Sequence, residues 1–507
     1  MNNSNIIQLF IKSAEQFPGR HVLLYGDDAI TYSELLKDVK QTAAAYSYKG
    51  ITQGDKVLVF VPMSIDLYRI VLALFYIGAC PVFLDEWVSV SRLKKCCEVV
   101  PCKALVAGTK LLAAALFIGS LRKIPVKLRT SLQDKSADGI DPVHVNGEET
   151  ALVTFTTGTT GTPKAANRTN NFLYAQYKAL EPLLKNDAQV SFVSLPIVTL
   201  INIGLGKTTL LPPKGFTKKW AEVYTQISDD LLRSHADEII CSPSVLLKIV
   251  PHATGCAHNI KHVFTGGGAV FPHDAQKITN TFPGARATVV YGSTEAEPIS
   301  HIDMDVLLAT DIAAIQEYGL PVGTISIAAQ CAVIPVTDKP IGPVSAREWQ
   351  ELILKPGDAG EIVVSGEHVL KGYVNNESAV KQQKINVAGT IWHRTGDAGR
   401  MDADGKLYLL GPHKEIIHHE GITYYPLITS YLCSVITATS GAALLLMNGQ
   451  LVLVIESARQ LEGVILNAAM DQLKLQAAAV RYVDSIPRDK RHNTKVDYEQ
   501  LRALLDS

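Results

Sequence analysis

The segment Thr156-Thr-Gly-Thr-Thr-Gly-Thr-Pro-Lys164 gathers hydroxyl groups, two glycines and one lysine in a short stretch. Gly158 and Gly161 permit backbone conformations in which successive amide groups turn toward an anion. The threonine hydroxyls add hydrogen-bond donors, and the lysine adds a positive charge. We expect the segment to bind a polyphosphate through Thr156, Thr157, Gly158, Thr159, Thr160, Gly161 and Lys164.

A second glycine-containing segment, Ile201 to Thr208, ends in Gly-Lys-Thr as a Walker A loop does. Such a loop has glycine at the position that Ile201 occupies, and a β-branched residue is unfavourable in that turn. We therefore interpret Lys207 as part of a structural loop. A P-loop ATPase built on Lys207 stays open as an alternative of a different class.

Three further motifs follow in order: Tyr291-Gly-Ser-Thr-Glu295, Arg394-Thr-Gly-Asp397, and a lysine near the end, Lys495. With the threonine-rich segment they resemble the adenylate-forming superfamily of acyl-CoA synthetases, luciferases and peptide-synthetase adenylation domains. Gly411 and Gly421 resemble the glycines around the interdomain hinge of these enzymes. The resemblance covers essentially the whole chain and implies an AMP-forming acid ligase of the acyl-CoA synthetase type.

By this resemblance, the motif from Tyr291 to Glu295 contacts the nucleotide and its metal. The ring face of Tyr291 suits stacking with adenine, and Gly292 belongs to the same nucleotide-binding segment. The hydroxyl of Thr294 would bond the α-phosphate, and Glu295 is a hard oxygen ligand for Mg²⁺. The resemblance thus implies ATP and Mg²⁺ as cofactors, with Thr294 and Glu295 taking part in catalysis.

Two other segments complete the nucleotide site that the resemblance implies. Asp397 is an acceptor suited to the two ribose hydroxyls, and Arg394 is expected beside it as a cofactor-binding residue. The backbone of Gly266, Gly267 and Gly268 would lie near the adenine and the acyl group.

Lys495 is expected to act in the first chemical step, in which a substrate carboxylate attacks the α-phosphate of ATP. An ammonium between the carboxylate and the phosphate would orient both groups and offset their negative charge. Mg²⁺ would withdraw charge from the leaving pyrophosphate. The acid is expected to be a fatty or other aliphatic acid, and coenzyme A is the expected acyl acceptor.

The sequence departs from the superfamily at the hinge and near its end. Pro412 follows Gly411 where the superfamily has arginine, which leaves a degenerate nucleotide-binding protein without activity as one alternative. The segments that resemble the β-lactone synthetases of bacterial olefin biosynthesis are Arg491-His-Asn-Thr-Lys495, Trp392-His-Arg394 and Tyr291 to Pro298. Those enzymes adenylate a 3-hydroxy acid whose own hydroxyl then displaces AMP, which is a second alternative and needs no coenzyme A.

Short apolar runs alternate with amphipathic stretches around these motifs. Strands are expected at 56–61, 80–84 and 151–155, and helices at 65–77 and 170–184. This alternation predicts an α/β fold in which a large region of stacked mixed and parallel sheets is covered by helices.

The chain is expected to divide into two domains at the hinge. Residues 1–410 would form the large adenylation domain, with a glycine-punctuated, β-rich module at about 350–410. Residues 411–507 would form a small, mobile α+β domain that swings over the site.

The amino-acid composition excludes some classes of binding partner and of chain. The chain has 48 lysine and arginine residues and 49 acidic residues, which gives a net charge of −1. Such a chain has no overall positive field that would attract nucleic acid. Hydrophobic residues make up 47%, which is enough for a large core and excludes a disordered chain. Because the sequence shows neither a signal peptide nor a stretch suited to a bilayer, we expect a cytoplasmic protein without a transmembrane segment that acts on a small carboxylic acid.

Overall fold

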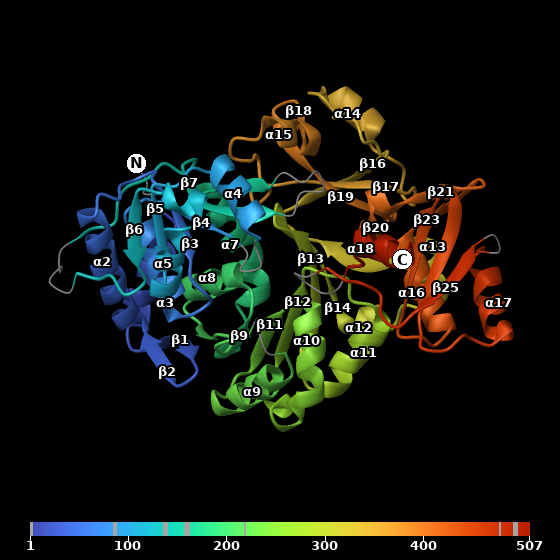
Figure 1. Cartoon of the computed structure of the whole chain (residues 1–507), viewed down its shortest axis with the longest axis horizontal. Helices are drawn as coiled ribbons and strands as arrows, with labels where there is room; N and C mark the ends of the chain where they lie inside the picture. Colours follow the sequence, from blue (N-terminus) through green and yellow to red (C-terminus); the bar gives the residue numbers. More distant parts are fainter. Residues whose placement is uncertain are drawn as a thin grey trace.

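The computed structural model describes residues 4–84, 89–134, 140–156, 163–216, 220–475, 478–489 and 495–506. Helices and two large sheets make up most of the chain, and the C-terminal elements lie at one end of the long axis (Figure 1). The N-terminal elements lie at the opposite end. The predicted α/β class, with a small α+β domain at the C-terminus, is confirmed.

The first sheet has six strands, of which the last runs antiparallel to its neighbour and the others run parallel. Val57 and Val59 pack in one hydrophobic cluster, whereas Leu58 packs in another on the opposite face. Both faces are thus covered by apolar side chains, which explains the continuous apolar run in the sequence. The strand order is β6 (Val126–Arg129), β5 (Ala104–Ala107), β3 (Lys56–Phe60), β4 (Cys80–Phe83), β7 (Thr150–Thr156) and β8 (Lys164–Thr169).

The second sheet has 14 strands and is parallel in its middle part, from β1 to β13. Beyond β13 every pairing is antiparallel. The order is β16 (Gln330–Ile334), β17 (Gly360–Ser365), β19 (Thr390–Met401), β20 (Lys406–Pro412), β15 (Leu320–Ile325), β14 (Ala296–Asp303), β13 (Arg286–Ser293), β12 (His262–Gly266), β11 (Glu238–Cys241), β9 (Val190–Val193), β10 (Thr208–Leu210), β1 (His21–Tyr25) and β2 (Asp28–Thr31), and β18 (Lys384–Val387) pairs with β19.

The β-rich module predicted at about 350–410 corresponds to strands β17 to β20. These strands are continuous with the second sheet, because β20 pairs with β15. The boundary between the two domains at 410/411 stays a prediction.

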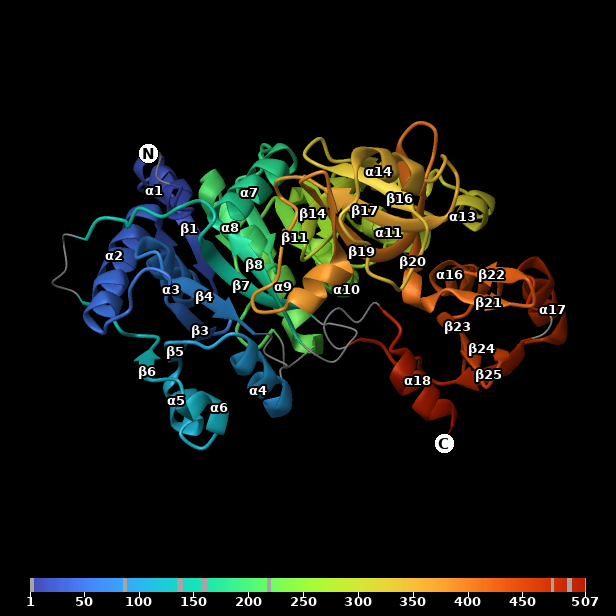
Figure 2. The same cartoon turned by 90° about the horizontal axis from the view of Figure 1, so that it is seen from above.

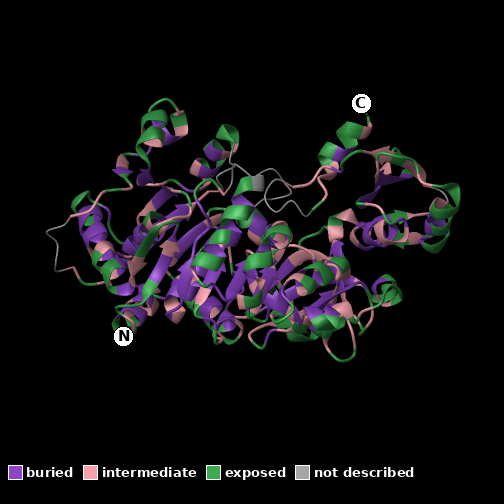
Figure 3. Cartoon of the chain, turned by 90° about the horizontal axis from the view of Figure 1, so that it is seen from below, coloured by how far each residue is buried: buried purple, intermediate pink, exposed green. Residues whose placement is uncertain are grey.

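Helices surround the two sheets, and their outward faces are exposed while the strands between them are buried (Figure 3). Helix α7 begins where the sequence predicts because the hydroxyl of Thr169 accepts a hydrogen bond from the amide of Phe172. The helices of this region are α1 (Ile7–Gln16), α2 (Tyr32–Tyr48), α3 (Ile65–Tyr76), α4 (Val90–Val99), α5 (Thr109–Ala115), α6 (Gly119–Arg122), α7 (Asn170–Leu184), α8 (Pro196–Leu205), α9 (Trp220–Arg233), α10 (Pro243–Ile249), α11 (Pro272–Thr281), α12 (Met304–Leu308), α13 (Ile312–Tyr318), α14 (Ala346–Leu352) and α15 (Glu377–Gln383), with short 3₁₀ turns at Val250–Gly255 and Ala257–Asn259.

The C-terminal domain follows a short 3₁₀ turn, η3 (His413–Glu415), and packs beside β20 (Figure 2). Tyr431 of its first helix stacks on Phe271 of the large domain, with ring centroids 4.0 Å apart and an interplanar angle of 11°. This stack joins the cores of the two domains. Its elements are β21 (Ile417–His419), β22 (Ile422–Tyr424), α16 (Pro426–Ile436), β23 (Gly441–Met447), β24 (Gln450–Glu456), α17 (Gly463–Gln472), β25 (Ala479–Val483) and α18 (Tyr498–Leu505).

Residues 188–206 include no Asp, Glu, Lys or Arg, and this stretch is divided between strand β9 and helix α8. None of the helices in the described ranges combines the length and the hydropathy that a bilayer span requires.

Candidate active site

The threonine-rich segment connects the last two strands of the first sheet. Thr156 ends β7 and pairs with Lys164, which begins β8. Five of its predicted phosphate ligands lie outside the described residues, and their role stays a prediction: Thr157, Gly158, Thr159, Thr160 and Gly161.

Lys164 is buried, and its ammonium lies over an aromatic ring. Its Nζ is 6.0 Å from the ring centre of Tyr373. Burial lowers the pKa of Lys164, the nearby Glu295 carboxylate opposes this change, and Lys414 reinforces it. A charged side chain is therefore held inside the protein at the start of β8, where an anion would be favoured.

Glu295 lies between β13 and β14 and faces the same tyrosine. The Tyr373 hydroxyl donates a hydrogen bond to Glu295 Oε1 at 3.0 Å. Arg168 Nη2 donates to the backbone carbonyl of Thr294 at 3.0 Å and so fixes this segment. The structure therefore brings together Lys164 and Glu295, which the sequence predicts as a phosphate ligand and a metal ligand.

The carboxylate of Glu295 suits a Mg²⁺ ion that is shared with a nucleotide. Mg²⁺ in such sites is held by one or two carboxylates together with substrate phosphates and water. Among the residues that the structure describes, no three His, Cys, Asp or Glu side chains cluster as a metal site. One protein carboxylate fits a shared ion, and Mg²⁺ bound there would neutralise phosphate charge.

Tyr291 and Asp397 form a buried pair between β13 and β19. The Tyr291 hydroxyl donates to Asp397 Oδ2 at 2.8 Å. Burial raises the pKa of Tyr291 and of Asp397, and the Asp397 carboxylate raises that of Tyr291 further. The two residues predicted to bind adenine and ribose are thus adjacent, although 106 positions separate them in the sequence.

Lys495 of the C-terminal domain lies within electrostatic range of Asp397 and Glu415. Burial raises the pKa of Asp397 and raises that of Glu415 to about 7, and the Lys495 ammonium opposes both shifts. The Lys495 amide donates to Asp489 Oδ1 at 2.8 Å, which fixes the backbone of the lysine. The predicted catalytic lysine therefore acts electrostatically on Asp397 of the large domain, and its catalytic role stays a prediction.

Arg394 differs from its predicted role, because its guanidinium is fully engaged within the protein. Its Nε and Nη2 donate to Glu361 Oε2 at 2.9 and 2.6 Å, and its Nη1 donates to the carbonyl of Lys339 at 2.9 Å. Both charged side chains are buried, and a buried carboxylate needs such a counter-charge. Arg394 is therefore not a direct cofactor ligand, and it joins β19, which carries Asp397, to β17.

The predicted backbone-binding glycines lie where neighbouring strands approach closely. A Cβ on Gly266 would lie 2.5 Å from a carbonyl oxygen of β13, and a Cβ on Gly292 would lie 2.8 Å from one of β14. Gly267 has a φ of +85°, and Gly268 follows it. Packing thus accounts for glycine at Gly266 and Gly292, while contact with adenine and the acyl group stays a prediction.

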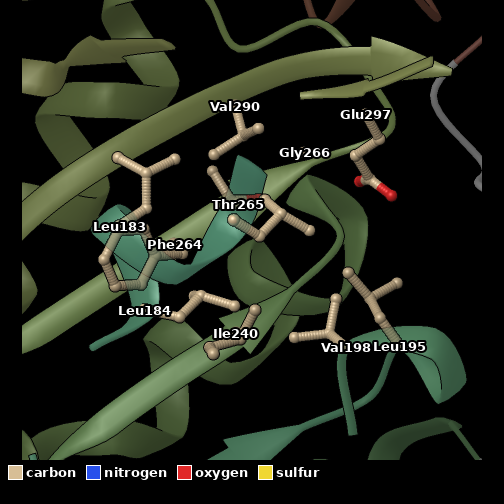
Figure 4. A pocket seen from close by; sticks show the side chains of 11 residues that line it. Leu183, Leu184, Leu195, Val198, Ile240, Phe264, Thr265, Gly266, Val290 and Glu297 are labelled. Atoms are coloured by element: carbon tan, nitrogen blue, oxygen red, sulfur yellow. The ribbon is translucent and has the colours of Figure 1, made fainter. Parts of the chain in front are cut away.

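An apolar pocket of about 30 Å³ lies between α7, α8 and strands β11 to β13 (Figure 4). Glu297 is the one charged residue among its described lining residues, and its carboxylate lies across the pocket from Leu183 and Leu184. Burial raises the pKa of Glu297, which Arg168 opposes. The lining residues are Leu180, Leu183, Leu184, Leu195, Val198, Ile240, Phe264, Thr265, Gly266, Val290 and Glu297.

The Walker-like segment has a structural role. Lys207 Nζ contacts Glu238 Oε1 at 2.6 Å and donates to the carbonyl of Leu184 at 3.0 Å. Both charged side chains are buried. The ammonium of Lys207 is thus bound to buried protein groups and does not face a nucleotide site. The P-loop alternative is therefore not supported, and Lys207 belongs to a structural loop.

Sequence reasoning misses four residues of this region: Tyr373, Lys384, Glu415 and Glu297. Tyr373, Lys384 and Glu415 belong to no recognised motif, and each is identified only through partners that are distant in the sequence. Glu297 carries the one local signal, a carboxylate two positions beyond the Glu295 that ends a motif.

Lys384 is the most unusual of the four. Its Nζ is 5.6 Å from the ring centre of Tyr373, on which Lys164 also lies. Burial lowers the pKa of Lys384 to about 7, with Glu295 opposing and Lys164 reinforcing the shift.

Comparison with known proteins agrees with this site. The AMP-binding enzyme family matches residues 10–374. The chain is 27% identical to the olefin beta-lactone synthetase of Xanthomonas campestris pv. campestris, over 76% of this chain and 72% of that protein. It is 25% identical to the olefin beta-lactone synthetase of Stenotrophomonas maltophilia, over 94% of this chain and 91% of that protein.

A solved structure shares the fold along nearly the whole chain. The O-succinylbenzoate coenzyme A synthetase of Bacillus subtilis, in complex with AMP, has a TM-score of 0.80 at 19% identity, covering 97% of this chain and 98% of that one. The family match favours an enzyme over the alternative of a protein without activity, because the matched family consists of enzymes. The chain belongs to the AMP-binding enzymes and is an adenylate-forming ligase.

Proposed function

We propose that the enzyme activates a carboxylic acid with ATP, forming an acyl adenylate and pyrophosphate. The observation that supports this proposal is that Lys495 of the C-terminal domain lies within electrostatic range of the buried carboxyl groups of Asp397 and Glu415. A related fold, the Bacillus subtilis synthetase, has been solved with ATP and magnesium ion.

The reaction needs charge compensation more than a protein nucleophile. A carboxylate oxygen of the acid attacks the α-phosphorus of ATP, the bond from that phosphorus to the bridging oxygen breaks, and pyrophosphate leaves. Lys495 would contact both reacting anions and lower their repulsion. Asp397 would accept hydrogen bonds from the ribose hydroxyls, with Tyr291 fixing its orientation.

For the second step we propose the 3-hydroxyl group of the same substrate as acyl acceptor. The hydroxyl oxygen attacks the carbonyl carbon of the acyl adenylate, the bond from that carbon to AMP breaks, and a β-lactone, AMP and a proton are released. Both olefin beta-lactone synthetases match most of this chain, which supports the proposal. Glu297 supports it independently, because a carboxylate in an otherwise apolar pocket suits a substrate with a hydroxyl donor.

Coenzyme A is the second candidate acceptor. The fold is shared with a coenzyme A synthetase, and the small domain is joined to the large one through a short turn about which it could swing. Transfer to the thiol would then replace ring closure as the second step.

The first step is tested by exchange of labelled pyrophosphate into ATP with a panel of acids and Mg²⁺. We expect exchange that depends on both the acid and the metal, with 3-hydroxy fatty acids preferred over unsubstituted acids of equal length. Release of ADP, or no exchange with any acid, would contradict the proposal.

The second step is tested by AMP release from a 3-hydroxy fatty acid with and without coenzyme A. We expect equal AMP release in both conditions and a β-lactone detectable by NMR. AMP release that requires coenzyme A, with a thioester as product, would favour the second candidate.

A further inference from the structure

Lys384 is a buried cation without a hydrogen-bond partner among the described residues. It begins β18 and pairs with His393 of β19, so the strand pairing fixes its backbone. Only 6% of the residue is exposed, and its Nζ has no hydrogen-bond acceptor there. Burial of an unpaired ammonium is unfavourable and lowers the stability of the fold. Packing alone therefore does not explain why a lysine occupies this position.

Three charged groups surround the ring of Tyr373. The Nζ atoms of Lys384 and Lys164 lie 5.6 and 6.0 Å from the ring centre, and the hydroxyl of that ring donates to Glu295. When Lys384 is protonated, the two lysines carry two positive charges against one carboxylate, and a bound anion would favour this protonated form. The neighbouring ring of His393 is neutral and adds no positive charge, because burial and the two lysines hold its pKa well below its ordinary value.

This cluster is therefore complementary to an anion, and more so once Glu295 shares a Mg²⁺ ion. A compact point charge such as an ammonium suits a phosphate oxygen. Lys384 lies at the Glu295 end of the candidate site, whereas Asp397 lies farther along β19 with Tyr291 and Lys495.

We propose that Lys384 binds the terminal phosphates of ATP and, after the first step, the pyrophosphate product. The inference rests on the proposed function for the identity of the nucleotide. It adds a phosphate-binding residue that lies in none of the recognised motifs and that contacts the same tyrosine ring as Lys164.

The test compares the affinity of the full-length enzyme for ATP, pyrophosphate and AMP by calorimetry, each with Mg²⁺ and without any acid. The variant Lys384→Met removes the charge and keeps most of the side-chain length. Lys381→Met is the matched control, because Lys381 is an exposed lysine on the preceding helix α15.

We expect Lys384→Met to weaken ATP and pyrophosphate binding about tenfold or more, the range for a lost charge-assisted hydrogen bond. AMP binding should change less than about twofold on the same scale, and the control should match the wild type for all three ligands. Equal weakening for AMP and ATP would show a purely structural role, and unchanged ATP and pyrophosphate affinity would also overturn the inference.

A second variant, Lys384→Arg, keeps the charge and should recover part of the pyrophosphate affinity that methionine loses. If Lys384→Met does not fold, arginine and glutamine variants provide the same comparison between a charged and an uncharged side chain. Binding is measured without acid, so an enzyme that binds ATP but shows no exchange would contradict the proposed function and leave this inference standing.

Discussion

Lys495 and Asp397 come from different domains, yet the ammonium of one acts on the pKa of the other. We expect Lys495→Met to lower pyrophosphate exchange by about 100-fold or more, since removal of a group that stabilises transition-state charge costs roughly this factor. Transfer from chemically prepared acyl adenylate should stay within about twofold of the wild type, because that step forms no bond to phosphorus. Both rates are measured on the same preparation.

Lys406→Met is the matched control for Lys495, since it removes an exposed lysine charge from β20. Normal exchange in the Lys495 variant would show that another cation performs the first step.

Lys207 allows a residue-scale test of the discarded P-loop. Removing one partner of a buried ion pair costs about 3–5 kcal/mol, so we expect Lys207→Met to lower the free energy of unfolding by this amount. The KM for ATP of the folded variant should be unchanged. Combining it with Glu238→Leu should recover stability, because the uncompensated carboxylate is then removed as well. A large rise in KM for ATP with normal stability would restore the nucleotide role.

At the residue scale, motifs predict the nucleotide side of the site better than its surroundings. The Tyr291 hydroxyl donates to Asp397, as their predicted roles at one nucleotide site require, and Lys495 lies within electrostatic range of Asp397. Arg394 is misassigned because its partner Glu361 lies in a strand that the motif does not contain. Lys384 could not be predicted for the same reason. Its burial depends on the pairing of strands, and no local sequence pattern indicates this pairing.

At the scale of elements, the stack of Phe271 on Tyr431 joins the large domain to helix α16. We expect Phe271→Ala to weaken docking of the C-terminal domain by about 1–3 kcal/mol, from lost apolar burial and ring contact. Small-angle scattering should show a larger radius of gyration, and proteases should cleave faster near η3. Phe117→Ala is the control, since Phe117 is 89% exposed.

An unchanged scattering profile for Phe271→Ala would show that other contacts, such as the hydrogen bond between Gln316 and the carbonyl of Gln472, suffice for docking.

The element pattern of the sequence predicts local structure well where a helix or a strand carries its own signal. Helix α7 covers the predicted 170–184, since Thr169 caps its start. Strands β4 and β7 lie within one residue of their predicted bounds. The joining of β17–β20 to the second sheet could not be predicted, because the pairing of β20 with β15 connects segments that are distant in the sequence.

At the scale of the whole molecule, Glu415 links stability to pH. Its pKa is raised from 4.5 to about 7 in the folded state, so the folded protein binds more protons than the unfolded chain between these values. The free energy of unfolding therefore falls as pH rises through this window. Glu415→Gln should match the wild type near pH 4.5 and exceed it by up to about 3 kcal/mol above pH 7.

Thermal unfolding from pH 4.5 to 8 measures this difference, with Glu420→Gln as an exposed control on the same segment. A difference that does not change with pH would mean that Glu415 is ionised to the same extent in both states.

The pairing of β18 with β19 has a consequence for substrate choice. Lys384 lies opposite His393, and Asp397 lies four residues farther along the same strand. Between them β19 carries a bulge, because four residue steps from Arg394 to Ala398 lie opposite only two steps of β17, from Val363 to Glu361. If Lys384 and Asp397 bind the two ends of ATP as proposed, the backbone of the hairpin formed by β18 and β19 fixes the distance between these two binding residues. A nucleotide that is one phosphate shorter would still bind Asp397 through its ribose but would not reach Lys384.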